Sequence, residues 1–220
     1  MFMSIENYVF PIFREKSEGI DFVGNGFFVG NLFFTAEHVI MPDRHIFYGD
    51  PFIIIGNRKV VLTHKVELKY KSLLYDENDC ASGHEDEDMT DFVVFKFVNV
   101  DINSPLRLAT SLPVPEQHLR CDFYHNNKNL LCSSQKIINK SPHTLYYWET
   151  EGVVETHKEY FVGNFFGVRM KPSHPHQGSS GSPLYDNNNI VYGILHNGQD
   201  DFCGFYSAFH AHQLLNQIHK

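Results

Sequence analysis

The stretch Gly178–Gly198, GSSGSPLYDNNNIVYGILHNG, places a turn of small residues directly before two apolar runs. Its first six residues hold two glycines and three serines. Glycine lets a backbone bend tightly and approach its neighbours closely, and an apolar strand behind the bend would hold the bend rigid. Ser180, in the middle of this turn, is therefore a candidate nucleophile.

The composition around this stretch favours an all-β fold. Among 220 residues, 20 Phe and 11 Tyr favour strands, and 15 Gly and 10 Pro supply frequent turns. Gly30-Asn31 lies between the apolar runs 27–29 and 32–34, which predicts a hairpin. The clear helical spacing is near the end, at Ala211, Leu214, Leu215 and Ile218.

The strand-like runs fall into two groups around a proline-rich segment. Residues 103–116, NSPLRLATSLPVPE, carry three prolines and no clean period, which is typical of a linker. We predict two packed antiparallel β-barrels with a short C-terminal helix, the first barrel in residues 1–105 and the second in residues 106–220.

The net charge of −8 is concentrated in one segment. Residues 76–91 hold eight acidic residues and no Lys or Arg, and the remaining 18 acidic residues equal the 18 Lys and Arg. This pattern predicts a solvated loop, with a calcium site or a basic partner surface as alternatives. We expect no nucleic-acid partner, because the sequence contains no basic stripe with interleaved aromatic residues.

The cysteines and the hydropathy pattern indicate a cytoplasmic protein. The four cysteines are widely spaced and form no CxxC pair, which suits a reducing compartment. The chain contains no run of eighteen apolar residues, and its first residues lack the basic region and apolar core of a secretion signal. We therefore expect no association with a membrane.

A serine nucleophile needs a base to accept its proton and a third group to orient that base. His38 follows the predicted hairpin in the segment TAEH, where strands would hold it in place. Asp91 begins the apolar run DFVVFKF. The order His38, Asp91, Ser180 along the chain thus supplies the three parts of a catalytic triad.

Three blocks of this sequence resemble the trypsin-like, chymotrypsin-fold serine proteases. They are GNGFFVGNLFFTAEHV, TDFVVFKF and GSSGSP, and they occur in the order of that family, followed by YGILHNG as the substrate-binding strand. The chain is more similar to the bacterial branch, with its glutamyl endopeptidases and periplasmic heat-shock proteases, because the disulfides of the animal enzymes are missing.

The resemblance implies a cofactor-free serine endopeptidase that cleaves protein or peptide substrates through an acyl-enzyme. His38 would be the general base, Asp91 its orienting carboxylate and Ser180 the nucleophile. The backbone N–H groups of Gly178 and Ser180 would form the oxyanion hole, and one such donor contributes roughly 3 kcal/mol in the transition state.

The residue before the nucleophile departs from the animal enzymes of the family. Ser179 stands where those enzymes place an aspartate that binds a newly cut N-terminus. We therefore expect a site that is either preformed or completed by a regulatory protein partner. Narrow specificity, such a partner, or the acidic loop would then restrain the protease.

By the same resemblance, the S1 pocket would involve His174, His196, Gly198 and Gly204. The two glycines predict a pocket open to a large side chain, and the histidines favour an acidic P1 residue. His196 stands one position later than the pocket histidine of glutamyl endopeptidases, however, so that acidic, apolar and basic P1 residues all stay open. His196 is alternatively expected to hydrogen-bond near Asp91.

Other chemistries have weaker support in the sequence. The pairs His174/His176 and His210/His212 alternate like two metal ligands on one strand face, but no HExxH or paired CxxC accompanies them, so we expect no metal. An esterase of the α/β-hydrolase type would need the order Ser, Asp, His. The main alternative to an enzyme is a catalytically silent scaffold on a protease fold.

Overall fold

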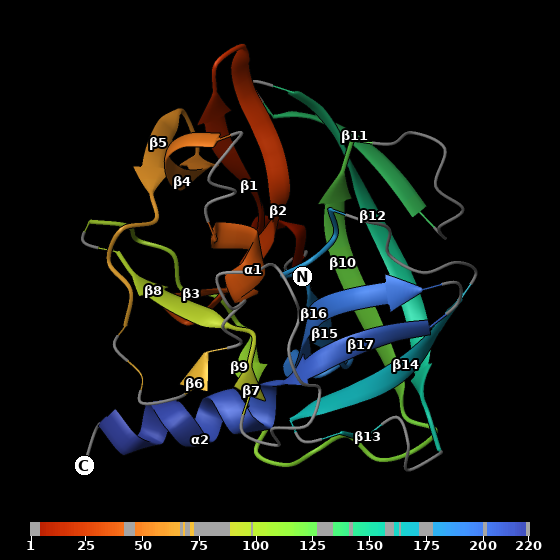
Figure 1. Ribbon diagram of the computed structural model, residues 1–220. Helices are drawn as coiled ribbons and strands as arrows, with labels where there is room; N and C mark the ends of the chain where they lie inside the picture. Colours follow the sequence, from red (N-terminus) through yellow and green to blue (C-terminus); the bar gives the residue numbers. More distant parts are fainter. Residues whose placement is uncertain are drawn as a thin grey trace, which may run out of the picture.

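The computed structural model shows a protein built mostly of antiparallel strands (Figure 1). The strands form a six-stranded sheet, a larger sheet of the second half and one short pair, and a helix follows the last strand. The all-β prediction is confirmed. The structure describes residues 5–41, 47–66, 68, 71–72, 89–97, 99–126, 134–140, 143–156, 161–162, 164–171, 178–199 and 202–218.

The first sheet has the strand order β5-β4-β1-β2-β3-β8 and curls into a half-barrel. Beyond β5, the Val66 N–H donates to Val94 O at 2.8 Å, so the chain crosses back to the far edge strand β8. The strands are β1 (Val9–Lys16), β2 (Gly19–Val29), β3 (Leu32–Thr35), β4 (Phe47–Ile55), β5 (Arg58–Val61) and β8 (Val93–Lys96). Two further strands, β6 (Lys71–Ser72) and β7 (Met89–Thr90), pair with each other in parallel.

The second sheet closes into a barrel, because β12 pairs with both β10 and β14. The closed circuit is β10-β15-β16-β17-β14-β12, and β9, β11 and β13 add to its sides. The strands are β9 (Arg107–Leu108), β10 (His118–His125), β11 (Ser134–Lys140), β12 (His143–Val154), β13 (Phe161–Val162), β14 (Phe165–Lys171), β15 (Pro183–Tyr185), β16 (Ile190–Gln199) and β17 (Phe202–Ser207).

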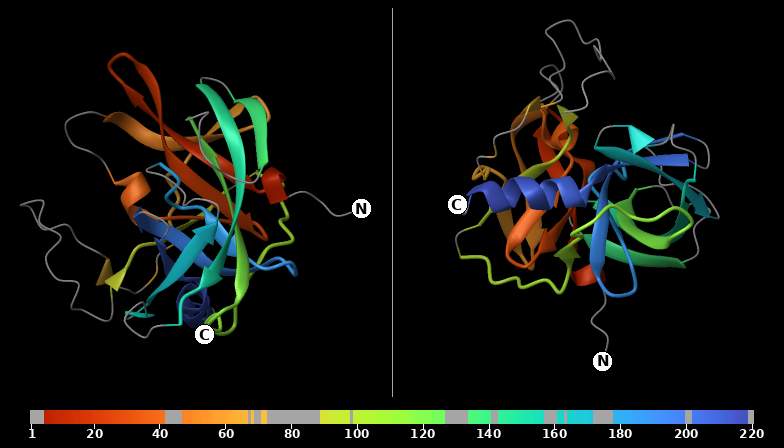
Figure 2. Two further views of the ribbon diagram at one scale, coloured as in Figure 1. Left: turned by 90° about the vertical axis from the view of Figure 1, so that its right-hand side faces the viewer. Right: turned by 90° about the horizontal axis from the view of Figure 1, so that it is seen from below.

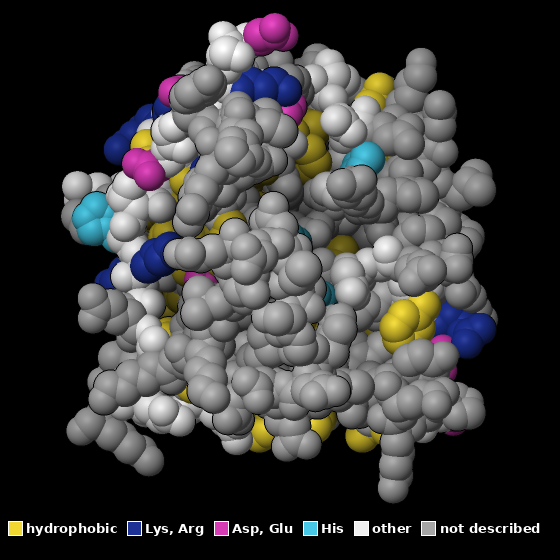
Figure 3. Space-filling view, viewed as in Figure 1, with side chains coloured by type: hydrophobic (Ala, Val, Ile, Leu, Met, Phe, Trp, Pro, Cys, Tyr) yellow, Lys and Arg dark blue, Asp and Glu magenta, His cyan; other side chains and the backbone are white. Residues whose placement is uncertain are grey.

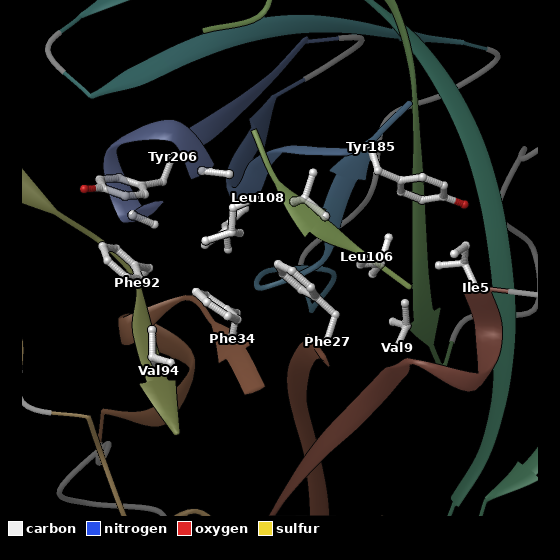
Figure 4. Close-up of a cluster of buried hydrophobic side chains, with 14 of the residues drawn as sticks. Ile5, Val9, Phe27, Phe34, Phe92, Val94, Leu106, Leu108, Tyr185 and Tyr206 are labelled. Carbon is white, nitrogen blue, oxygen red and sulfur yellow. The ribbon is translucent and has the colours of Figure 1, made fainter. Parts of the chain in front are cut away.

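Strand alternation divides the buried apolar side chains into three clusters. On β2, Phe28 packs inside the first sheet and Phe27 packs between the two sheets. The cluster between the sheets also receives Phe92 and Tyr185, which come from opposite halves of the chain (Figure 4). The third cluster fills the closed barrel. Because β2 buries side chains on both of its faces, it stabilises the interior of the first sheet and also the packing of the two sheets against each other.

Two short helical segments and one longer helix complete the fold. The 3₁₀ turn η1 (Ile5–Asn7) precedes β1, and α1 (Glu37–Ile40) is a single turn after β3. Helix α2 (Ala208–Ile218) starts directly after β17 and lies on the side of the molecule that the right-hand view of Figure 2 shows from below. It buries Ala211 and Leu214 against the cluster between the sheets. Within the described residues, the helices are all too short and polar to cross a membrane.

The structure confirms one local prediction and adds strands that the sequence had not revealed. The expected hairpin is present, with Val29 opposite Leu32, but β1 and β11 had not been predicted. Pro11 hides β1 in the sequence; it is tolerated there because β4 pairs with β1 only from Phe13 onward, so that Pro11 faces a ladder on the β2 side alone. The expected linker contains β9, which pairs in parallel with β16.

Two expectations about polar residues also change. His210 and His212 lie on helix α2 and not on a strand, so residues two apart point in different directions and do not form a ligand pair. His174, His176 and most of the acidic segment (residues 76–88) lie outside the described residues.

Candidate active site

His38 and Asp91 meet because they lie at the same edge of the first sheet. Strands β3 and β8 are antiparallel neighbours with Thr35 opposite Val93, so the end of β3 and the start of β8 coincide. His38 follows β3 on the single turn α1, and Asp91 directly precedes the apolar end of β8. The sheet thus brings together two residues that are 53 positions apart in sequence.

Asp91 is a buried carboxylate with three hydrogen-bond donors. It is 2% exposed, and its Oδ1 accepts the backbone N–H of His38 at 3.0 Å. Its Oδ2 lies 2.7 Å from His38 Nδ1 and also contacts His196 Nδ1. Because an ionised carboxylate only accepts hydrogen bonds, both histidines carry their proton on Nδ1. The Nε2 of His38 is then free to accept a proton.

The electrostatics of Asp91 favour its charged form. Burial, the largest single influence, would raise the pKa of this carboxyl group, but hydrogen bonds from His196 and His38 outweigh burial and lower the pKa to about 2. Asp91 is therefore ionised throughout the neutral range. A buried negative charge beside His38 would stabilise the imidazolium that forms when His38 takes a proton.

Ser180 lies in the nucleophile loop, which we define as residues 178–182, directly before β15. Gly178 has a φ of +99°, a conformation that side chains disfavour, although the space around a Cβ at this position is open to 3.4 Å. The N–H groups of Gly178 and Ser180 donate no hydrogen bond to any described residue. Two N–H groups of one loop that donate to no described residue, one of them that of the serine, are available as donors for an oxyanion.

The Ser180 hydroxyl does not contact His38 in this state. It donates to the backbone oxygen of His196 at 3.3 Å, and the described residues hold no hydrogen bond between Ser180 and the His38 ring. A distance of 3.3 Å is long for an O–H···O bond, so little free energy opposes a rotation about χ1. Catalytic hydrogen bonds often form only when substrate is bound.

His196 reaches Asp91 because of a β-bulge in β16. Leu195 pairs with Phe205 and Asn197 with Gly204, which leaves His196 as the extra residue. Leu195 points into the closed barrel, and the His196 ring points out toward Asp91, between His38 and Phe165. The prediction that His196 hydrogen-bonds near Asp91 is confirmed, and its part in an S1 pocket stays a prediction.

The other predicted S1 residues are only partly placed. His174 lies outside the described residues, and Gly198 is exposed near the end of β16. Gly204 does not border empty space as expected, because a Cβ there would lie 2.5 Å from Asn197 Oδ1. Asn197 therefore occupies the opening that the glycine was predicted to leave for a large substrate side chain.

Asn25 is a site residue that the sequence did not reveal. It is fully buried on β2, yet its side-chain Nδ2 donates to Gly178 O in the nucleophile loop at 3.1 Å. Its backbone N–H donates to Ser180 O at 2.8 Å. The available signal was a polar residue between two glycines, GNG, directly before the apolar run FFV.

His38, Asp91 and His196 also have the composition of a metal site, since one ligand atom from each lies within 4.8 Å of the others. Zinc takes such ligands at about 2.0–2.2 Å, which separates tetrahedral ligand atoms by more than about 3 Å. The 2.7 Å between His38 Nδ1 and Asp91 Oδ2 is a hydrogen-bond length. As placed, this group fits a hydrogen-bond network and not a metal ion.

The face that Figure 3 shows has no single dominant charge among its described residues. Lys and Arg side chains are scattered there among Asp and Glu side chains. Asp91 is a buried charge at the site.

Comparisons with known proteins match the structure but not the sequence. No protein-family model and no curated protein matches the chain. The active form of the Rv3671c protease from M. tuberculosis has a TM-score of 0.61 and 13% identity, covering 97% of this chain and 82% of its own. Kallikrein-related peptidase 10, in complex with Zn²⁺, has a TM-score of 0.61 and 15% identity, covering 99% and 98%. The inactivated protease paralogue S-I1 of the scabies mite has a TM-score of 0.64 and 11% identity, covering 97% of this chain and 94% of its own.

These likenesses show the fold, which is the chymotrypsin-like fold of trypsin-like proteases. The similar structures include proteins of a bacterium, a mite and plant viruses, so they do not assign the chain to the bacterial branch. They include an active protease and an inactivated one, and the fold alone therefore does not decide whether this chain is an enzyme.

Proposed function

We propose that this protein is a serine endopeptidase that forms an acyl-enzyme on Ser180. Ser180 Oγ attacks the peptide carbonyl carbon while its proton passes to His38 Nε2. The N–H groups of Gly178 and Ser180 stabilise the oxyanion, and the C–N bond breaks as His38 returns the proton to the leaving amine. Water then repeats the sequence with His38 as the base, releasing the acid and restoring Ser180.

One observation carries the proposal more than any other. A buried, ionised Asp91 holds His38 by both its ring Nδ1 and its backbone N–H, which sets the ring's tautomer and its orientation together. A scaffold has no need of such a costly buried charge at this place. The undonated N–H groups of the nucleophile loop add independent support.

The test is covalent labelling of the purified protein with a fluorophosphonate, followed by peptide mass spectrometry. We expect an adduct on Ser180 in the native chain and none in Ser180→Ala or His38→Ala. Ser104→Ala serves as the matched control, because Ser104 is also a buried serine but bonds the Leu106 N–H and lies outside the nucleophile loop. An adduct that persists in Ser180→Ala, or no adduct in folded native protein, would contradict the proposal.

The second candidate is a silent scaffold on the same fold. It is favoured by the Ser180 hydroxyl, which faces the His196 carbonyl and not His38, and by the likeness to an inactivated protease paralogue. Labelling separates the two candidates, since the scaffold would leave Ser180 unmodified. Peptide products from an unfolded protein substrate would then establish endopeptidase activity and identify the P1 residue.

The P1 preference and the regulation remain proposals of narrower scope. His196 Nδ1 is bound to Asp91, so an acidic P1 residue would have only its Nε2 to contact, and acidic, apolar and basic P1 residues all stay open. Restraint by a regulatory protein partner rests on Ser179, which stands in place of the aspartate of a terminal-amine switch. Action in the cytoplasm rests on the wide spacing of the four cysteines. Labelling with and without candidate partners measures the first, and fractionation of cells measures the second.

A further inference from the structure

We propose that Asn25 is the positioning residue that holds the nucleophile loop in its oxyanion-binding shape, so that the site is complete without cleavage of the chain. This inference rests on the proposed function. In a terminal-amine switch, an aspartate before the nucleophile binds the new N-terminus and so holds the loop. Here the side-chain amide of Asn25 would hold the loop instead. Ser179, which stands at that position here, is fully buried and carries no charge.

The side chain of Asn25 binds across the two halves of the molecule. Its Nδ2 donates to Tyr124 O and to Gly178 O, both at 3.1 Å, and its Oδ1 accepts the Tyr124 N–H at 2.8 Å. The amide therefore pairs with β10 in the way a peptide bond of a neighbouring strand would. With 0% exposure, it has no water to replace any of these partners.

The backbone of Asn25 fixes the same loop at a second point. Strand β3 pairs with β2 only as far as Gly26 and Thr35. One residue further, the Asn25 N–H donates to Ser180 O at 2.8 Å, and the Asn25 carbonyl accepts the Thr35 hydroxyl at 2.6 Å. Beyond Gly26, the nucleophile loop thus takes the place of β3 as the hydrogen-bond partner of β2.

These bonds determine where the loop's N–H groups point. Asn25 holds the carbonyls of Gly178 and Ser180, while Ser182 donates to the carbonyl of Ser179 between them. In a trans peptide the N–H points opposite to the carbonyl, so the Ser180 N–H points away from Ser182. Asn25 thus holds the peptide groups on both sides of the Ser179–Ser180 peptide, and with them the path of the chain that carries the Gly178 and Ser180 N–H groups.

The decisive variant is Asn25→Asp, which keeps the side-chain shape but replaces Nδ2 by an oxygen. That oxygen would face the carbonyls of Tyr124 and Gly178: a carboxylate could donate to neither of them, and a protonated carboxyl group could donate to only one. Ser104→Ala is the matched control: Ser104 is also buried and bonds a backbone N–H, that of Leu106, but it contacts nothing in the nucleophile loop. Both variants lose buried hydrogen bonds, and only the first disturbs the loop.

The readout is the ratio of kcat/KM for 4-nitrophenyl acetate to that for its thiono analogue, in which sulfur replaces the carbonyl oxygen. Sulfur accepts hydrogen bonds weakly, so an intact oxyanion hole favours the oxygen ester. A fraction of unfolded or dead enzyme lowers both rates equally and leaves the ratio unchanged. We expect the ratio to fall roughly 100-fold in Asn25→Asp and to stay at the native value in Ser104→Ala.

An unchanged ratio in folded Asn25→Asp would overturn the proposal. If that variant does not fold, hydrogen exchange of the Asn25 Nδ2 protons in the native protein decides, with the signals assigned through contacts to Tyr124 and Gly178. Exchange only by global unfolding supports the proposal, and exchange at the rate of an exposed amide contradicts it. This measurement stays valid if native Ser180 proves unreactive, which would refute the proposed function and not the role of Asn25 in holding the loop.

Discussion

At the scale of single residues, the site depends on how one carboxylate is shared. Asp91 Oδ2 receives Nδ1–H groups from both His38 and His196, and these hydrogen bonds outweigh a burial that would by itself raise the Asp91 pKa. His196 acts through Asp91 and through its own backbone oxygen, which holds the Ser180 hydroxyl. In the proposed mechanism it is a positioning residue and not a member of the proton-transfer path.

Replacing His196 by leucine should weaken the site without unfolding it. The substitution removes one donor from a buried charge, which costs about 1.5–3 kcal/mol, and we expect kcat/KM to fall about 10- to 100-fold. The Asp91 pKa should rise from about 2 toward its ordinary value. His196→Gln, which keeps an N–H donor, should retain most of the activity. Ester hydrolysis and NMR titration of Asp91 measure both effects; equal activity in the leucine variant and the native protein would show that His196 does not position Asp91.

At the scale of elements, the nucleophile loop is shaped by how closely it approaches β2. A Cβ on Gly181 would lie 2.0 Å from the Asn25 carbonyl oxygen, and Gly181 has a φ of +83°. Gly30, in the hairpin turn between β2 and β3, has a φ of +56° and open space around it. A Cβ added at Gly30 would be disfavoured by the backbone conformation alone. A Cβ added at Gly181 would also collide with β2, so the two variants distinguish these two costs in unfolding free energy.

We expect Gly181→Ala to cost at least about 3 kcal/mol of unfolding free energy, because the loop must move away from β2. Gly30→Ala should cost only about 1 kcal/mol, from the left-handed conformation alone. Urea unfolding measures both variants, and fluorophosphonate labelling should be lost only in Gly181→Ala. Full labelling in a stable Gly181→Ala protein would mean that the close approach to Asn25 does not matter for the site.

At the scale of the whole molecule, the two buried carboxylates Asp91 and Asp122 have opposite effects on how the stability depends on pH. Asp122, on β10, accepts hydroxyl bonds at Oδ2 from Tyr147 and Tyr185, but its Oδ1 has no partner among the described residues. Burial raises its pKa to about 6, despite the lowering effect of these hydroxyls. A raised pKa means that the folded state favours the protonated form, so Asp122 reduces stability as the pH rises from about 4 through 6.

Asp122→Asn should therefore stabilise the protein at neutral pH and not in acid. A shift from 3.8 to about 6 corresponds to about 3 kcal/mol, so we expect the variant to gain up to that amount at pH 7.5 and almost nothing below pH 4. Urea unfolding of both proteins at the two pH values measures the difference. A gain that does not depend on pH would indicate that Asp122 acts through packing and not through its charge.

Asp91 acts in the opposite direction on the same stability profile. Its lowered pKa adds stability that is present above about pH 4 and is lost as the pH falls through about 2. The molecule thus combines a charge that favours folding at neutral pH with one that opposes it. Functional sites are common places for such strained or perturbed groups.

The sequence by itself determined the fold class, the hairpin and the three triad candidates. These depend on local patterns: alternating apolar residues, a two-residue turn, and small residues at one bend. The pairing of β3 with β8 then brought His38 to Asp91, as the order of the motifs had implied.

Only the tertiary structure showed the contacts of Asn25 and of the Ser180 hydroxyl, and it showed that His196 bonds Asp91, one of the two alternatives left open by the sequence. Asn25 bonds Tyr124 from 99 residues away, and no local pattern carries information about a partner so distant. His196 turns to Asp91 through a bulge of one residue, which changes the facing of every later residue on β16 yet leaves no mark in composition. Register and long-range hydrogen bonds are set by how complete surfaces fit together, and that fit exists only in the folded chain.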